Sequence, residues 1–207
     1  PPGPSMRYLA MLASVLLLML TGVVMVLSAS TPASIGQDGD AFSVFGRHAT
    51  YVTVGIFVLL FTVGRDYRSW RRIAPLLLAA AFLGLVLVLL FGRTTGGSRR
   101  WLDLGLFGLQ PSEITKLALV VSLASFLDQR RYFLERIDRV TVPVAVCLAV
   151  LCGLILQQPD LGTAAIIGSI ALGMMWAAGV PFTHLALLSA PGLISGLLLA
   201  FAQPYRR

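Results

Sequence analysis

Long apolar runs separated by short polar connections constrain this chain more than any other feature. Each run is about as long as the stretch of about 20 apolar residues that a helix needs to cross a bilayer. Only 12% of the residues are charged, against about 25% in soluble domains, and the mean hydropathy is +0.86. The predicted helices cover residues 8–27, 48–63, 73–91, 112–127, 142–156, 161–180 and 183–202. We therefore expect an all-α, polytopic membrane helix bundle of about seven spans, forming a single transmembrane domain over residues 1–207.

The arginines favour one orientation of these spans. With the N-terminus in the cytoplasm, the inner connections hold Arg7, Arg65, Arg68, Arg71, Arg72, Arg130, Arg131, Arg136 and Arg139. The outer connections then hold Arg47, Arg93, Arg99, Arg100, Arg206 and Arg207. Nine against six agrees with the tendency of basic residues to stay inside, so we expect a cytoplasmic N-terminus. The net charge of +7 is divided among these clusters and does not indicate a nucleic-acid-binding face.

Cysteine and histidine do not indicate a metal site. Cys147 and Cys152 lie five residues apart in one apolar run, without a second pair at zinc spacing. His48 and His184 fall near span ends on opposite sides of the membrane, where we expect both to be interfacial residues. The first apolar run is too long for a signal peptide and indicates a retained helix. The leading PPGPS and the final QPYRR suggest a fragment of a longer chain.

One polar segment, residues 97–116, interrupts the apolar pattern and contains most of the candidate site residues. Arg99 and Arg100 can bind phosphate or carboxylate bidentately, although arginines near span ends also reach lipid phosphates. Trp101 is either an interfacial anchor or a stacking surface for a sugar. Glu113 and Lys116, the latter the only lysine in the chain, lie three residues apart on one helix face. We expect them to pair, either structurally or lining a polar cavity.

Two helix starts frame this polar region. Pro111 and Ser112 read as the start of a helix, with Ser112 as a possible cap. Asp160, in the stretch QQPDLGT, is either the N-cap of the sixth span or part of one outward-opening polar pocket with Arg99, Arg100, Glu113 and Lys116. Both segments are expected on the same side of the membrane, which makes such a pocket possible.

The stretches GGSRRWLDLGLFGLQPSEITKLALV (96–120) and QQPDLGTAAII (157–167) resemble the hallmark segments of the SEDS family, the FtsW, RodA and SpoVE proteins of bacterial cell-wall synthesis. The segments SAST (28–31) and GDAF (39–42), with the loop form GGSRRW, look more like the division branch, FtsW, than like RodA. The resemblance covers the whole chain.

This resemblance implies a peptidoglycan glycosyltransferase of about ten spans in the cytoplasmic membrane, which polymerises lipid II on the outer face for septal synthesis. It implies functional roles for Trp101 and Asp160, which match family motif residues, with Glu113 and Lys116 as a supporting pair. We infer that Arg99 and Arg100 also contact the substrate, as donors to its pyrophosphate. The family's catalytic aspartate is expected beyond Arg207, so we expect no catalytic residue in this chain and no activity from it alone.

Expected partners are lipid II or another undecaprenyl-pyrophosphate-linked substrate, a class B penicillin-binding protein, divisome proteins and membrane lipids, with no nucleic acid. No cofactor or metal is predicted, although a divalent metal stays open. Two alternatives remain, a lipid II flippase and a non-enzymatic scaffold that recruits a transpeptidase. A flippase would be expected to show inverted repeats and broken helices, and neither is evident in the sequence.

Overall fold

The computed structural model describes residues 6–35, 43–95, 98–103 and 108–202. The GDAF segment and both chain ends lie outside the described residues. The chain divides into two compact units, Pro1–Asp66 and Tyr67–Arg207, which are described separately.

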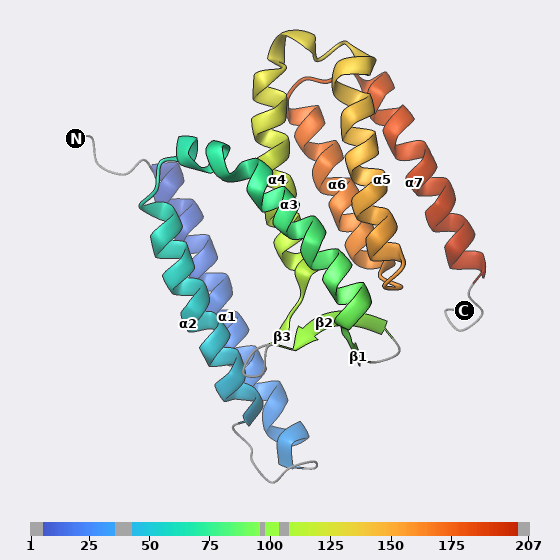
Figure 1. The fold of residues 1–207 in the computed structure, drawn as a ribbon. Coiled ribbons are helices and arrows are strands. Elements are labelled where there is room, and N and C mark those ends of the chain that lie inside the picture. The colour runs from blue at the N-terminus through green and yellow to red at the C-terminus, as the bar shows by residue number, and fades with distance from the viewer. Residues whose placement is uncertain (1–5, 36–42, 96–97, 104–107, 203–207) are drawn as a thin grey trace. The chain divides into compact units, whose positions relative to one another are not determined.

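The first unit is a pair of helices. They are α1, Met6–Ile35, and α2, Ser43–Val63, and they pack side by side (Figure 1). Gly55 of α2 faces α1, since a Cβ at this position would lie 3.8 Å from the Met19 methyl carbon. Most of the apolar side chains of α1 are exposed, as expected of a helix whose surroundings are lipid.

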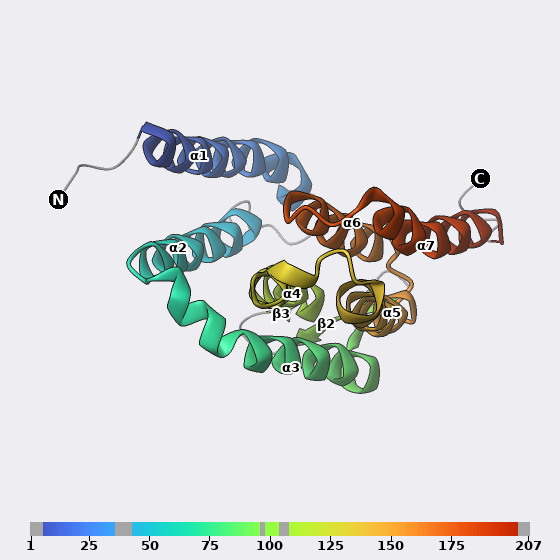
Figure 2. The ribbon, with the colours of Figure 1, turned by 90° about the horizontal axis from the view of Figure 1, so that it is seen from above.

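The second unit holds five helices, a small sheet and two short helical turns. The helices are α3 (Tyr67–Phe91), α4 (Pro111–Gln129), α5 (Val142–Leu156), α6 (Leu161–Ala177) and α7 (Phe182–Ala202). The antiparallel strands β1 (Arg93–Thr95), β2 (Ser98–Asp103) and β3 (Gly108–Leu109) join α3 to α4. Between α4 and α5 lie a 3-10 turn, η1 (Arg131–Phe133), and a π-helical turn, η2 (Ile137–Thr141). Viewed along the bundle, α4 lies between α3 and α6 (Figure 2).

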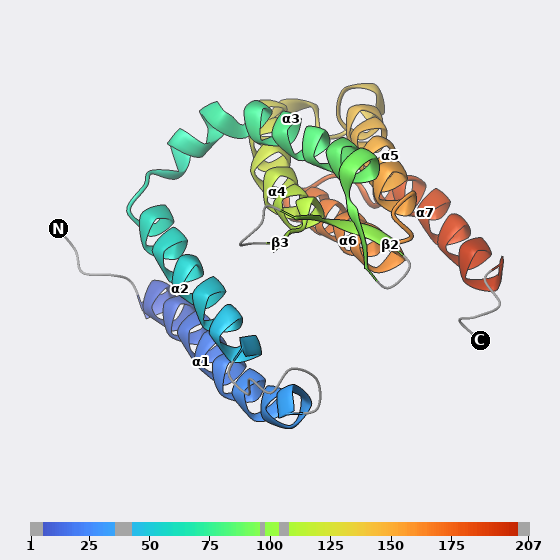
Figure 3. The same cartoon turned by 60° about the horizontal axis from the view of Figure 1, so that its bottom comes forward.

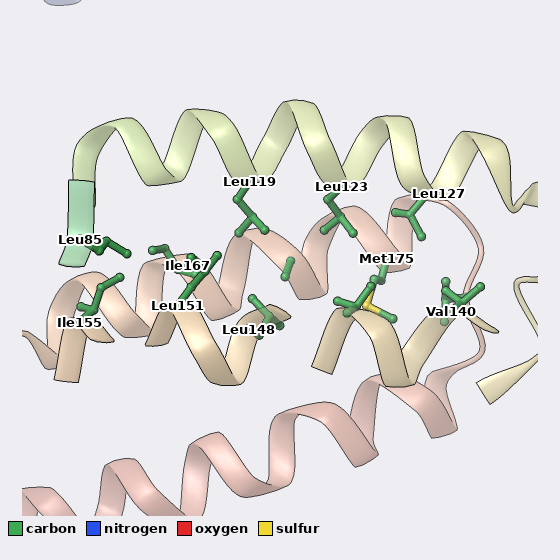
Figure 4. Packing of buried hydrophobic residues seen from close by; sticks show 13 residues of the cluster. Leu85, Leu119, Leu123, Leu127, Val140, Leu148, Leu151, Ile155, Ile167 and Met175 are labelled. Carbon is green, nitrogen blue, oxygen red and sulfur yellow. The ribbon is translucent and has the colours of Figure 1, made fainter. Parts of the chain in front are cut away.

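The core of this unit lies where α4, α5 and α6 meet. Leucines at every fourth position of α4 point toward α5 and α6 (Figure 4), because residues four apart share a helix face. Ile167 and Met175 of α6 are fully buried in the same cluster. Since these helices are apolar all round, spacing marks the buried face better than hydrophobicity does.

Three contacts fix α3 and α4 as antiparallel neighbours. Ser122 Oγ donates to the carbonyl of Ala74 at 2.9 Å, a type of interhelical bond common between membrane helices. At one end, Arg71 Nη1 lies 3.0 Å from Asp128 Oδ2. At the other end, a Cβ on Gly84 would lie 3.2 Å from Pro111 Cβ, so the two backbones approach closely beside the sheet.

The predicted helices are confirmed over the described residues, with α5 occupying residues 142–156 as expected. Within the part of the chain that the structure describes, three helices are long and apolar enough to cross a membrane, at Leu9–Ser28, Arg68–Phe91 and Ile137–Leu156. Two shorter helices are also apolar, His48–Val63 and Leu161–Ala177. The fold is therefore that of a polytopic membrane helix bundle. The number of spans, the cytoplasmic N-terminus and the single transmembrane domain stay predictions.

Candidate functional site at the sheet end of the bundle

Arg99 and Arg100 are neighbours in strand β2 but differ in exposure. The strand pairs with β1 so that Thr94 lies opposite Arg99, and with β3 so that Leu102 lies opposite Leu109. The register with β1 shifts between Arg93 and Thr94, which pair with Trp101 and Arg99, so Arg100 is the extra residue of a bulge. Arg99 and Trp101 are exposed, whereas Arg100 is half-buried. The two arginines therefore have different surroundings.

Arg100 reaches the turn between α5 and α6. Its Nη2 donates to the Pro159 carbonyl at 2.6 Å and its Nε to the Gln158 carbonyl at 3.3 Å. Its Nη1 lies 3.7 Å from Asp160 Oδ2. A planar guanidinium can satisfy two carbonyls and a carboxylate at once. We call this set of contacts the Arg100 clasp, and it holds β2 against the α5–α6 turn.

Asp160 is the N-cap of α6 and also lies beside Arg100. Its Oδ1 accepts from the backbone N–H of Thr163 at 3.1 Å, which makes it the N-cap of α6. Its Oδ2 accepts from the Thr163 hydroxyl at 2.8 Å and faces Arg100. The side chain is only 11% exposed, so a buried carboxylate is held by a cap, a hydroxyl and a cation. The N-cap prediction and the proximity of Asp160 to Arg100 are both confirmed.

The Pro159 carbonyl accepts the shortest bond of the Arg100 clasp, at 2.6 Å. The clasp and the Asp160 cap together hold the α5–α6 turn in place.

The start of α4 differs from the expected cap. The N-cap is Gln110, without a side-chain hydrogen bond, and Pro111 is the first helical residue. The prediction that Ser112 caps the helix is wrong, because Ser112 lies inside the first turn with a buried hydroxyl. Among the described residues, Ser112 Oγ and Gln158 Nε2 are buried without a protein hydrogen-bond partner. Both lie in segments that flank β2.

The expected pair on α4 is confirmed. Lys116 Nζ lies 2.8 Å from Glu113 Oε1, with Lys116 25% and Glu113 57% exposed. Strand β2 packs on both α3 and α4, and its position beneath the ends of these helices is visible in Figure 3. The pair therefore lies in the helix that borders the Arg100 clasp. That the pair shares one pocket with the clasp stays a prediction.

The sheet itself was missed in the sequence. Residues 99–102, Arg-Arg-Trp-Leu, do not alternate between polar and apolar side chains, so the sequence carries no strand signal here. Gly108 is where the sheet needs a glycine, because a Cβ there would lie 3.3 Å from Trp101 Cε3. Trp101 is thus placed by β3 and is 42% exposed. The described residues contain no group of three His, Cys, Asp or Glu that could hold a metal ion, and the lack of a metal stays a prediction.

Known proteins resemble this chain over its whole length. It is 39% identical over 207 residues to a probable peptidoglycan glycosyltransferase FtsW of Aeromonas salmonicida, covering 100% of this chain and 52% of the relative. It is 34% identical over 193 residues to the stage V sporulation protein E of Bacillus subtilis, covering 92% of this chain and 53% of that protein. The chain thus spans about half the length of these curated relatives.

Solved structures share the fold. The rod shape determining protein RodA of Thermus thermophilus matches with a TM-score of 0.65 and 27% identity, over 87% of this chain and 58% of that one. A chain from a structure concerning polymerization and crosslinking by a peptidoglycan synthase complex matches with the same TM-score and identity, over 90% of this chain and 56% of that one. The family model for FtsW, RodA and SpoVE, described as a cell cycle protein, matches residues 8–207. The chain therefore belongs to the FtsW, RodA and SpoVE family.

Proposed function

We propose that this chain forms the substrate-holding part of a peptidoglycan glycosyltransferase that polymerises lipid II for septal wall synthesis. The observation that carries the proposal is the Arg100 clasp, which joins β2 to the α5–α6 turn and gathers polar groups at one end of an apolar bundle. The names of the FtsW relatives support the reaction. We place the enzyme in the bacterial cytoplasmic membrane, with this site on its outer face.

The reaction sets requirements that the sheet end can meet. The acceptor's 4-hydroxyl oxygen forms a bond to the donor's anomeric carbon, while the bond from that carbon to the pyrophosphate oxygen breaks. Undecaprenyl pyrophosphate leaves with the electron pair, and a carboxylate general base takes the hydroxyl proton. We expect that carboxylate in the part of the relatives' length that this chain does not span. Cations beside the departing pyrophosphate stabilise the charge that develops there.

We divide this work among the predicted residues. Arg99 and Trp101 have exposed side chains on β2, so we assign them to the pyrophosphate and to a sugar face. Arg100 and Asp160 act as positioning residues, because their bonds to the α5–α6 turn fix where β2 lies. Glu113 and Lys116 support the site from α4. A class B penicillin-binding protein and divisome proteins are the proposed partners, without a cofactor.

A polymerisation assay tests this assignment. A protein that carries this chain together with the rest of its relatives' length is reconstituted with lipid II, and glycan product and head-group translocation are both measured. We expect glycan polymer without translocation. Replacing Arg99, Trp101 or Asp160 by alanine is expected to lower the polymerisation rate at least tenfold, equivalent to about 1.4 kcal/mol in the barrier.

Arg71→Gln provides the matched control. It removes an arginine with one ion-pair partner at the opposite end of the same unit, and normal activity is expected. Unchanged polymer yield from the site variants at normal expression contradicts the assignment and favours a scaffold. Translocation without polymer contradicts the glycosyltransferase and favours a flippase.

A further inference from the structure

The connection between α4 and α5, at the end of the bundle away from the sheet (Figure 1), is strongly basic. Residues 130–139 contain four arginines and two acids. Nothing in the proposed glycosyl transfer uses this connection. Its arginines are not surrounded by water alone, because aromatic rings lie beside three of them.

Part of the connection curls around a hollow of about 530 Å³. Its lining residues are Arg131, Tyr132, Phe133, Leu134, Glu135, Arg136 and Gly179. Two arginines and one glutamate are therefore among the residues that line the same hollow. Each guanidinium has five N–H donors; Arg131 Nη2 donates to the Tyr132 hydroxyl at 2.9 Å, and Arg136 Nε to Asp138 Oδ1 at 3.4 Å.

Aromatic rings accompany the arginines of this connection. The guanidinium carbon of Arg130 lies 4.0 Å from the ring centre of Phe126, and that of Arg139 lies 4.6 Å from that of Phe133. Arg131 lies 4.8 Å from the ring of Tyr132, which is 80% exposed. Side chains with an apolar body and a polar tip concentrate where hydrocarbon meets head groups.

The neighbouring elements place the hollow at that depth. The apolar span Ile137–Leu156 begins within the connection. The span Arg68–Phe91 also begins at this end, where Arg71 pairs with Asp128. Both observations put residues 131–136 at the edge of the hydrocarbon layer, which is where phospholipid phosphates lie.

We propose that this hollow binds the head group of an anionic phospholipid, with its phosphate between Arg131 and Arg136. Paired guanidiniums match phosphate oxygens, and basic pockets at the ends of membrane helices bind anionic head groups. The exposed ring of Tyr132 and the half-exposed ring of Phe133 give the lipid's glycerol and acyl carbons an apolar border. An acidic protein segment would bury less apolar surface against these two rings than a lipid does. This inference does not depend on the proposed glycosyl transfer.

Native mass spectrometry of the detergent-purified protein tests the proposal. Phosphatidylglycerol and phosphatidylcholine are added at equal concentration, and bound lipid is counted. We expect phosphatidylglycerol to be retained at least fivefold more, and the double variant Arg131→Gln with Arg136→Gln to lose most of this preference. As matched control, Arg65→Gln with Arg68→Gln removes one arginine from the α2–α3 connection and one from the first turn of α3, and is expected to change retention less than twofold.

A gain-of-binding variant excludes misfolding as the cause. Glu135→Gln removes the carboxylate from the hollow and is expected to raise phosphatidylglycerol retention at least twofold. Equal losses in both arginine double variants, or no gain in Glu135→Gln, overturn the site in favour of general charge attraction. Equal retention of the two lipids in the unaltered protein, or full displacement of lipid by inorganic phosphate, also overturns it.

Discussion

Arg100 shows how a single side chain can join two segments that lie far apart in the sequence. Its three contacts come from consecutive residues, Gln158 to Asp160, so one planar group spans the whole α5–α6 turn. Lysine has the same charge, but its compact ammonium cannot reproduce the planar, forked arrangement of N–H donors of a guanidinium. The identity of the side chain therefore matters more here than its charge.

Arg100→Lys tests this distinction. We expect it to lower the free energy of unfolding by about 1–2 kcal/mol, because at least one buried carbonyl of the turn loses its donor. Arg71→Lys is the control, since Arg71 makes an exposed pair with Asp128 and such pairs contribute about 0–1 kcal/mol. Thermal unfolding in detergent measures both. Equal effects of the two substitutions contradict the Arg100 clasp.

At the scale of elements, sequence reasoning succeeded for the helices and failed for the sheet. Apolar runs such as 142–156 are bounded by polar residues or proline, and the bilayer requirement fixes their length. The strands are two to six residues long and depend on pairing that no local pattern specifies. The Arg100 contacts could not be foreseen either, because they cross 58 and 59 positions of the chain. The Glu113–Lys116 pair was predictable because helix geometry alone brings the two together.

The close approach of α3 and α4 predicts an asymmetry between two glycines. Gly84→Ala places a methyl group 3.2 Å from Pro111 Cβ, so the helices must separate at the sheet end, at a cost of about 1–3 kcal/mol. Gly168→Ala in α6 meets nothing within 4 Å and is expected to be neutral or to stabilise by up to about 1 kcal/mol, from helix propensity. Unfolding in detergent compares the two variants, and an equal loss contradicts tight α3–α4 packing.

At the scale of the whole molecule, the sheet and the α4–α5 connection lie at opposite ends of the second unit (Figure 1). The arginine count predicts that the sheet faces outward and that the α4–α5 connection faces the cytoplasm. The proposed polymerisation and the proposed lipid contact would then occupy opposite leaflets.

Labelling with a membrane-impermeant thiol reagent tests this orientation. In a protein with Cys147 and Cys152 replaced by alanine, Leu109→Cys is expected to react in intact spheroplasts. Glu135→Cys is expected to react only after the membrane is opened. The reverse pattern contradicts the cytoplasmic N-terminus.

The Arg100 clasp also sets an order of assembly during synthesis. The α5–α6 turn follows Arg100 by 58 and 59 positions, so it enters the membrane after α3 and α4. Until the turn arrives, Arg100 cannot make its carbonyl and carboxylate contacts. The sheet end therefore reaches its final structure after α3 and α4 have inserted, once Asp160 lies beside Arg100.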